Sequence, residues 1–192
     1  MPSNEIEGIF FQIIILFIQM KTILLFISLL TSMSFFSKNE PLSIESIRLN
    51  YIKAVEDEDI TEKMLEKITG EHLKNPLFLA YRGAFEGLMA KHVFNPYKKI
   101  SYLNLSNKTL AQAIKQKPNN VEMRFLRFSM QHYVPDFLGQ SKELKEDKIA
   151  IVENVATDNE LTKESQKVVC QFMIDCNRCT DEEVKMFKRL LK

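Results

Sequence analysis

Three cysteines in the last quarter of the chain come closest to a chemical motif by type and spacing. Cys176 and Cys179 form a C-x-x-C pair, and Cys170 lies just upstream. A structural zinc site needs four ligands, but the three histidines are distant in sequence and there is no second C-x-x-C pair. A redox-active pair normally starts a helix that follows a strand, whereas this pair falls between two predicted helices. We therefore favour core thiols, with a structural disulfide between Cys176 and Cys179 as the alternative, ahead of metal binding or catalysis.

Other catalytic motifs do not occur in the sequence. It contains no nucleophile elbow, phosphate-binding loop, zinc-protease motif or dinucleotide fingerprint. Paired carboxylates that act in hydrolysis come together only in space, so the sequence does not test for them. We expect no cofactor, no metal and no catalytic residues. The alternative is an enzyme of the cell envelope whose catalytic residues are dispersed along the chain.

The charge balance argues against a nucleic-acid partner. The chain has 26 Lys and Arg residues and 25 Asp and Glu residues, so its formal net charge is +1. Such a chain has no field of one sign that would attract nucleic acid. One local cluster combines basic and aromatic residues: Lys91, His92, Tyr97, Lys98, Lys99 and Tyr102. We interpret it as the solvated ends of helices.

Three arginines are candidates for contacting a partner. Arg82, Arg124 and Arg127 fall on predicted helices that would line the concave side of a helical-repeat array. Grooves of this kind commonly hold peptides, and a guanidinium group can bind a carboxylate through two hydrogen bonds. The partner would then be a protein or a peptide. The alternative is local pairing of these arginines with Glu86 or Glu122.

A loop that follows the third of these arginines carries large apolar residues. Residues 133–139 read YVPDFLG, with aromatic side chains at Tyr133 and Phe137. We expect the loop to fold back onto the core. A partner-binding lip is the alternative.

The elements that position these residues are predicted to be helices. Gly and Pro are scarce (5 and 6 residues), and from Ser43 onward apolar residues recur every three to four positions. The helix from Pro76 to Val93, capped by Asn75, has large residues on one side and small residues on another, which is typical of a central helix. Asn107 interrupts the apolar face of the next helix, and we expect it to be satisfied by hydrogen bonds. Helices over Ser141 to Ala156 and Asn159 to Cys176 follow, and Thr180 and Glu183 predict a capping box at the last helix. About eight helices joined by short connections favour an antiparallel array.

The N-terminal segment predicts export or membrane attachment. Residues 9–36 are apolar with Lys21 as their only charge. In the favoured interpretation translation begins at Met20, Met20-Lys21 is a short basic region before the apolar residues 23–30, and Ser32-Met33-Ser34 offers a signal-peptidase site. The alternative is an uncleaved helix that associates with the membrane through residues 9–36, with Lys21 near the middle of the run.

The helix before Pro118 resembles the second helix of a tetratricopeptide repeat. Ser106, Leu110, Ala113 and Pro118 stand where that family has a small residue, a large residue, Ala and Pro. The match ends near Glu122, and the helix starts near Asn75, Asn119 and Asn159 are roughly 40 residues apart, longer than the repeat of that family. The resemblance implies a degenerate array of antiparallel helix pairs.

Two longer stretches, residues 81–103 and 124–139, resemble parts of small uncharacterised bacterial exported proteins with repeat-like helices. This resemblance implies a fold and brings no activity with it. Together these features predict a signal peptide or membrane anchor over residues 1–37 and an all-α, tetratricopeptide-like domain over residues 38–192. We expect a non-enzymatic scaffold for a protein or peptide, either exported to the periplasm or cell envelope or tethered to the membrane.

Overall fold

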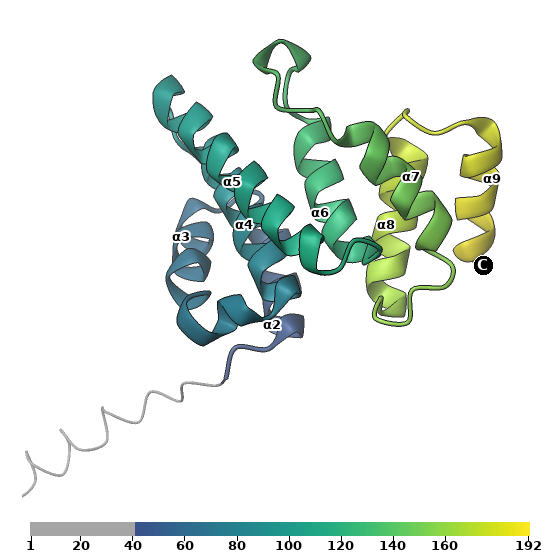
Figure 1. Ribbon diagram of the computed structural model, residues 1–192, viewed down its shortest axis with the longest axis horizontal. Coiled ribbons are helices and arrows are strands. Elements are labelled where there is room, and N and C mark those ends of the chain that lie inside the picture. Colours follow the sequence, from purple (N-terminus) through teal and green to yellow (C-terminus); the bar gives the residue numbers. More distant parts are fainter. Residues whose placement is uncertain (1–40) are drawn as a thin grey trace, which may run out of the picture. The chain divides into compact units, whose positions relative to one another are not determined.

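The computed structural model describes residues 41–192, where every regular element is a helix (Figure 1). The all-α prediction is confirmed for these residues. The predicted signal or anchor helix lies outside the described residues. Within residues 41–192, none of the helices combines the length and apolar character needed to cross a bilayer.

Eight α-helices and two short 3-10 helices follow one another in this part of the chain. In order they are α2 (Ile44–Ala54), α3 (Glu58–Lys67), η1 (Gly70–Lys74), α4 (Pro76–His92), α5 (Pro96–Gln116), α6 (Val121–His132), η2 (Asp136–Leu138), α7 (Leu144–Asn154), α8 (Lys163–Asp175) and α9 (Asp181–Leu190).

Side-chain caps fix where several of these helices begin. The Ser43 hydroxyl accepts the Ser46 amide at 3.1 Å, and Asn75 accepts the Leu77 amide at 2.9 Å ahead of Pro76. Thr180 and Glu183 form the predicted capping box, in which each side chain accepts the backbone N–H of the other residue. These local signals were readable in the sequence because a capping side chain bonds within three residues of itself.

Two helix starts differ from the sequence prediction. α7 begins at Leu144 rather than Ser141, because the Ser141 hydroxyl donates to the carbonyls of Gln131 and Val134 and holds this residue in the preceding loop. α8 begins at Lys163 rather than Asn159, because Thr162 provides the cap by accepting the Ser165 amide at 3.1 Å. The connection before α8 is therefore longer than predicted.

The small residues of α4 allow a close approach of α5, as the two-sided pattern predicted. An added Cβ at Gly83 would lie 2.8 Å from Leu110 Cγ and 3.0 Å from the Leu110 amide nitrogen. At Gly87 it would lie 3.0 Å from Ser106 Oγ. The Ser106 hydroxyl donates to the Gly83 carbonyl at 2.7 Å, so a side chain of α5 is also hydrogen-bonded to the backbone of α4.

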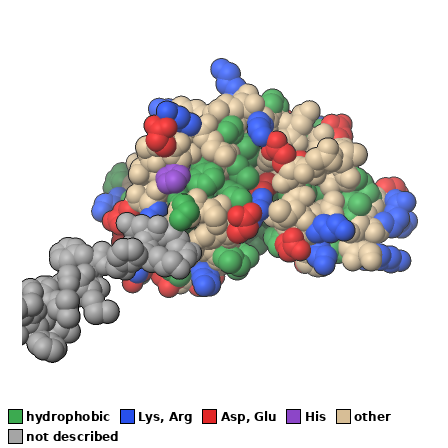
Figure 2. Space-filling view, turned by 90° about the horizontal axis from the view of Figure 1, so that it is seen from below, with side chains coloured by type: hydrophobic (Ala, Val, Ile, Leu, Met, Phe, Trp, Pro, Cys, Tyr) green, Lys and Arg blue, Asp and Glu red, His purple; other side chains and the backbone are tan. Residues whose placement is uncertain are grey.

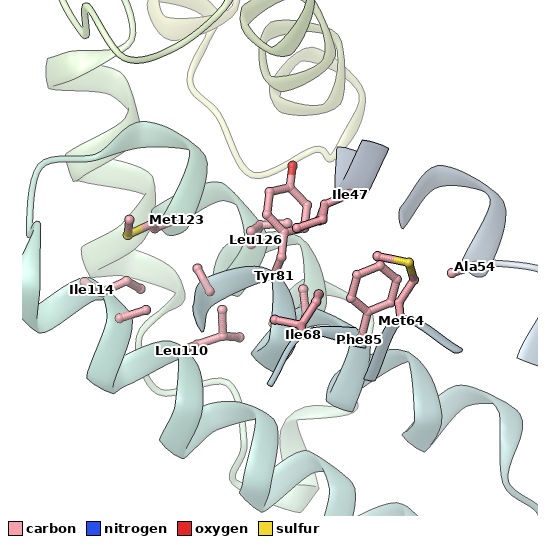
Figure 3. Close-up of a cluster of buried hydrophobic side chains, with 13 residues drawn as sticks. Ile47, Ala54, Met64, Ile68, Tyr81, Phe85, Leu110, Ile114, Met123 and Leu126 are labelled. Carbon is pink, nitrogen blue, oxygen red and sulfur yellow. The ribbon is translucent and has the colours of Figure 1, made fainter. Parts of the chain in front are cut away.

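Buried apolar side chains form two clusters, and α6 contributes to both. The first cluster lies among α2 to α6, and Figure 3 shows Phe85, Met64 and Ile68 meeting within it. The second joins α6 to α7, α8 and α9 around Phe128 and Phe187. Residues 121–129 of α6 are all buried, so α6 is surrounded more completely than α4, which the sequence predicted to be the central helix.

The helices pack mainly with their neighbours in sequence. α4 lies along α5, α6 against α7, and α8 against α9. α6 contacts both α4 and α8, so the first helices of successive pairs also touch one another. α4 contacts α2 as well.

Candidate functional site

Arg124 and Arg127 lie in the interface between α6 and α7, where both bind Asp147. Arg127 donates from Nε to Asp147 Oδ2 and from Nη2 to Oδ1, each at 2.7 Å, and Arg124 donates from Nη1 to Oδ1 at 2.9 Å. Asp147 is completely buried, and both arginines are buried as well. Arg124 also donates to the Pro118 carbonyl at 2.7 Å. The two guanidinium groups therefore fasten α7 and the turn before α6 to the buried helix.

Arg82 joins α4 to the end of α3. Its Nη1 donates to the carbonyl oxygens of Leu65 and Ile68 at 2.9 Å and 2.7 Å, and its Nε lies 3.2 Å from Glu86 Oε1. Carbonyls in the last turn of a helix lack intrahelical partners, so the guanidinium satisfies groups that would otherwise need water. The pairing with Glu86 is one of the two local pairs that the sequence offered as alternatives.

The other local candidate, Glu122, binds residues that sequence reasoning did not single out. Arg48 of α2 donates to both Glu122 carboxylate oxygens, at 2.7 Å from Nε and 2.6 Å from Nη2, and Tyr81 of α4 donates to Oε1 at 2.7 Å. Burial raises the pKa of the Tyr81 phenol, and the Glu122 carboxylate adds to that shift. This ion pair links α2 to α6 across 74 positions of sequence, so no local sequence pattern predicts it.

The three predicted arginines thus act inside the domain, and the structure does not bring them together in one open groove. Arg82 pairs with Glu86, as the alternative had it, whereas Arg124 and Arg127 pair with Asp147 and not with Glu86 or Glu122. The binding of a partner by these three arginines stays a prediction.

The cysteines lie around the end of α8. Cys170 and Cys176 are buried, Cys179 is half-buried, and all three are free thiols. The Cys176 thiol donates to the Met173 carbonyl at 3.4 Å. Burial, followed by the neighbouring Cys176, raises the pKa of the Cys179 thiol to about 12, so this thiol is protonated and weakly nucleophilic at neutral pH. Within residues 41–192, no group of three or more His, Cys, Asp or Glu side chains is placed to hold a metal ion. The Cys176–Cys179 disulfide stays the alternative to the favoured prediction of core thiols.

The basic residues around the α4–α5 turn are engaged with neighbouring helix ends. Lys91 lies 2.7 Å from Glu56 Oε1, His92 Nε2 lies 2.8 Å from the Ala54 carbonyl, and Lys99 donates to the Ala90 carbonyl at 3.0 Å. These contacts agree with our interpretation of the cluster as helix ends. Phe94 in the same turn is 98% exposed.

The loop between α6 and α7 does not fold back onto the core as we expected. Tyr133 exposes 76% of its surface and Phe137 exposes 87% (the two residues are called the aromatic lip below). Figure 1 shows the loop standing out from the helices between α6 and α7. The prediction was wrong, and at the base of the loop polar side chains hydrogen-bond to one another instead.

A network of side-chain hydrogen bonds secures the base of this loop. Asn107 donates to Gln140 Oε1 at 2.7 Å and accepts from Gln131 at 3.0 Å, so the prediction of a satisfied Asn107 is confirmed. Gln140 also donates to Asn104 at 3.0 Å, and Gln131 donates to Glu143 at 2.7 Å. At the far end Gly139 adopts a positive φ of 63°, which ends η2 without steric cost. The loop is therefore tied to α5 and α6 while its aromatic tip faces solvent.

Aromatic rings of α6 and α8 lie behind the lip. The Tyr133 ring is 4.8 Å from the His132 ring and 6.2 Å from the Phe172 ring, centroid to centroid, in edge-to-face arrangements. Arg178 donates from Nε to His132 Nδ1 at 2.9 Å. Burial and then the Arg178 charge lower the pKa of His132, so this imidazole is neutral at physiological pH and accepts that bond. The lip continues into an aromatic surface backed by the second core cluster.

Comparison of the chain with models of protein families, with curated proteins and with solved structures finds no match in any of the three.

Proposed function

We propose that this chain is a protein of the cell envelope whose helical-repeat domain, residues 38–192, holds a protein or peptide partner without catalysing a reaction. The order of helix packing supports a repeat array. In a tetratricopeptide-like array each helix pairs with its neighbour, and the first helices of successive pairs touch. The contacts of α4 with α5 and α6, and of α6 with α7 and α8, follow that order.

The single observation that carries the proposal is the exposure of the aromatic lip on a secured loop. Burying a large apolar side chain in an interface is worth about 2 kcal/mol. Aromatic side chains are enriched among the residues that dominate binding energy, particularly when they need little ordering on binding. Because Gln140 and Ser141 hold the loop base in place, Phe137 is presented to a partner at low entropic cost.

The envelope location rests on the N-terminal sequence. In our proposal, residues 1–37 are a signal peptide or an anchor, with Met20 as the favoured start. N-terminal sequencing of native protein tests this step. A mature N-terminus soon after Ser34 supports a cleaved signal, a retained apolar segment in the membrane fraction supports the anchor, and a retained segment in the cytoplasmic fraction contradicts both.

Site-specific photo-crosslinking tests the partner surface. A photoreactive phenylalanine analogue is placed at position 137 of the full chain in cells, and the matched control carries it at position 94, which is equally aromatic and 98% exposed. We expect one reproducible adduct of defined mass from position 137, absent from position 94 and reduced by Tyr133→Ala. The same adducts from both positions, or none from position 137, would contradict the proposal.

A further inference from the structure

Four basic side chains lie in the second half of α9 and just beyond its end, after the acidic first turn of the helix. Lys185, Lys188 and Arg189 are exposed, and their spacing of three and one positions places them on the same side of α9. Exposed Lys192 follows two residues after the helix ends at Leu190. These four residues alone line a shallow hollow of the surface. Figure 2 shows Lys and Arg side chains gathered at the end of the domain where α9 lies. We call these four residues the α9 basic face.

The positive charge of this face is not balanced from within the described part of the chain. None of the four side chains takes part in a salt bridge among residues 41–192, although exposed lysines elsewhere, such as Lys117 with Glu160, do. The acidic residues of α9 are confined to its first turn, which is close to Lys185 but at the opposite end of the helix from Lys188 and Arg189. The helix dipole favours Lys188 and Arg189 in the last turn, and Lys185 lies three to four positions after Glu182 and Asp181. Like charges on neighbouring positions of a helix repel, so an external anion would stabilise the arrangement.

The composition of the face indicates which anion fits it. Three of the four residues are Lys, which acts as a flexible point charge, whereas recognition of protein carboxylates favours the two-pronged geometry of Arg. Lys is also depleted from protein–protein interfaces, which need apolar anchors. The apolar residues of α9 provide none, because Phe187 is fully buried and Met186 and Leu190 pack against the second core cluster. A small ligand would need an enclosed site, and the hollow is shallow.

We propose that the α9 basic face docks onto the anionic phospholipid headgroups of a bilayer. From Lys185 to Arg189 the helix advances about 6 Å, and Lys192 follows beyond its end, so neighbouring headgroups can be contacted at once. This contact rests on the envelope location proposed above. If the apolar N-terminal segment is retained as an anchor, the contact adds a second, electrostatic membrane signal to it, and after cleavage it acts alone. Two weak signals together hold a domain at a membrane far more firmly than either alone.

Lysine footprinting of the full chain tests the proposal. The protein is combined with vesicles of phosphatidylcholine alone or with about one-third phosphatidylglycerol, and acetylation of each lysine is followed by mass spectrometry. We expect Lys185 and Lys192 to react about fivefold more slowly with the anionic vesicles, and the protection to disappear at about 0.5 M salt. Exposed Lys63 of α3 should react equally with both kinds of vesicle.

Charge reversal provides matched variants. Lys188→Glu with Arg189→Glu should abolish the protection of Lys185 and Lys192, while Lys108→Glu with Lys115→Glu, on exposed positions of α5, should leave it intact. Equal reaction rates with both kinds of vesicle, protection that persists at high salt, or protection by soluble polyglutamate in place of vesicles would overturn the proposal. Flotation with phosphatidylcholine vesicles separately reports the apolar anchor, so failure of the anchor is distinguishable from failure of the basic face.

Discussion

At the scale of single residues, two buried carboxylates of the domain have opposite surroundings. Asp147 accepts three hydrogen bonds from two arginines, at 2.7 to 2.9 Å. Glu86 is almost equally buried, but only its Oε1 has a partner, Arg82 at 3.2 Å, and its Oε2 accepts no hydrogen bond. A buried charge is tolerated when it is paired and hydrogen-bonded, and otherwise shifts toward its neutral form. The two residues should therefore respond differently to removal of their charge.

Removing the charge of Asp147 should destabilise the domain. Asp147→Asn leaves the buried Arg124 and Arg127 with only the largely exposed Glu146 as a counter-charge, and we expect the free energy of unfolding to fall by about 3 kcal/mol. Glu146→Gln is the matched control, because Glu146 contacts the same Arg124 but is largely exposed, and its loss should cost at most about 1 kcal/mol. Urea unfolding measures the free energy of unfolding of both variants. Equal losses would contradict the claim that the buried carboxylate stabilises the domain more than the exposed one.

Removing the charge of Glu86 should have the opposite effect, with a distinct pH dependence. Burial raises the pKa of Glu86, so the folded state holds this proton more tightly than the unfolded state. The stability contributed by protonated Glu86 is present below the ordinary pKa of a glutamate and is lost as pH rises through its raised value. Glu86→Gln should therefore match the parent at low pH and be the more stable protein at pH 7.

The pKa of Glu146 shifts in the opposite direction to that of Glu86. The hydrogen bond from Arg124 lowers the pKa of Glu146, so its small contribution is present above the ordinary pKa of a glutamate and is lost as pH falls. Unfolding curves of Glu86→Gln and Glu146→Gln between pH 3 and 8 should thus diverge from the parent in opposite directions at neutral pH. A Glu86→Gln variant that is less stable than the parent at pH 7 would refute our account of this residue.

At the scale of elements, the caps and small-residue patterns of the sequence predicted the helices well, and their contacts less well. Asn75, Pro76 and the capping box at Thr180 act within one turn, so their effect is visible in the sequence. The Arg48–Glu122 pair joins residues 74 positions apart, and the partner of Arg124 lies on a different helix from the one we considered. Such pairs depend on how helices stack, which local spacing does not specify.

The close approach of α4 and α5 makes Gly83 the most restrictive small residue. Gly83→Ala would place a Cβ 3.0 Å from the backbone nitrogen of Leu110, which has little room to move, so we expect a loss of about 2 kcal/mol in unfolding free energy. Gly87→Ala meets the flexible Met130 side chain and Ser106 Oγ, and its cost should stay under about 1 kcal/mol because alanine also favours the helix. A Gly83→Ala variant that is more stable than the parent would contradict the observed packing.

At the scale of the whole molecule, composition was enough to predict an all-α domain, and it predicted the exposed surface poorly. Large apolar residues are usually buried, so the sequence favoured a loop that covers the core with Tyr133 and Phe137. In the structure the base of the loop is instead tied by hydrogen bonds among Gln131, Asn107 and Gln140. Polar networks of this kind form only when several helices converge, so the lip was visible in the sequence only as an alternative.

The proposed function depends on whether the lip holds a partner. Quantitative co-purification of the native full chain from envelope fractions measures this most directly, with Phe137→Ala compared against Phe94→Ala. We predict a stoichiometric partner that is retained by Phe94→Ala and reduced by roughly tenfold or more in Phe137→Ala, since a central aromatic contact is worth about 2 kcal/mol. Equal recovery of the partner with both variants, or no stoichiometric partner with the parent protein, would contradict the account.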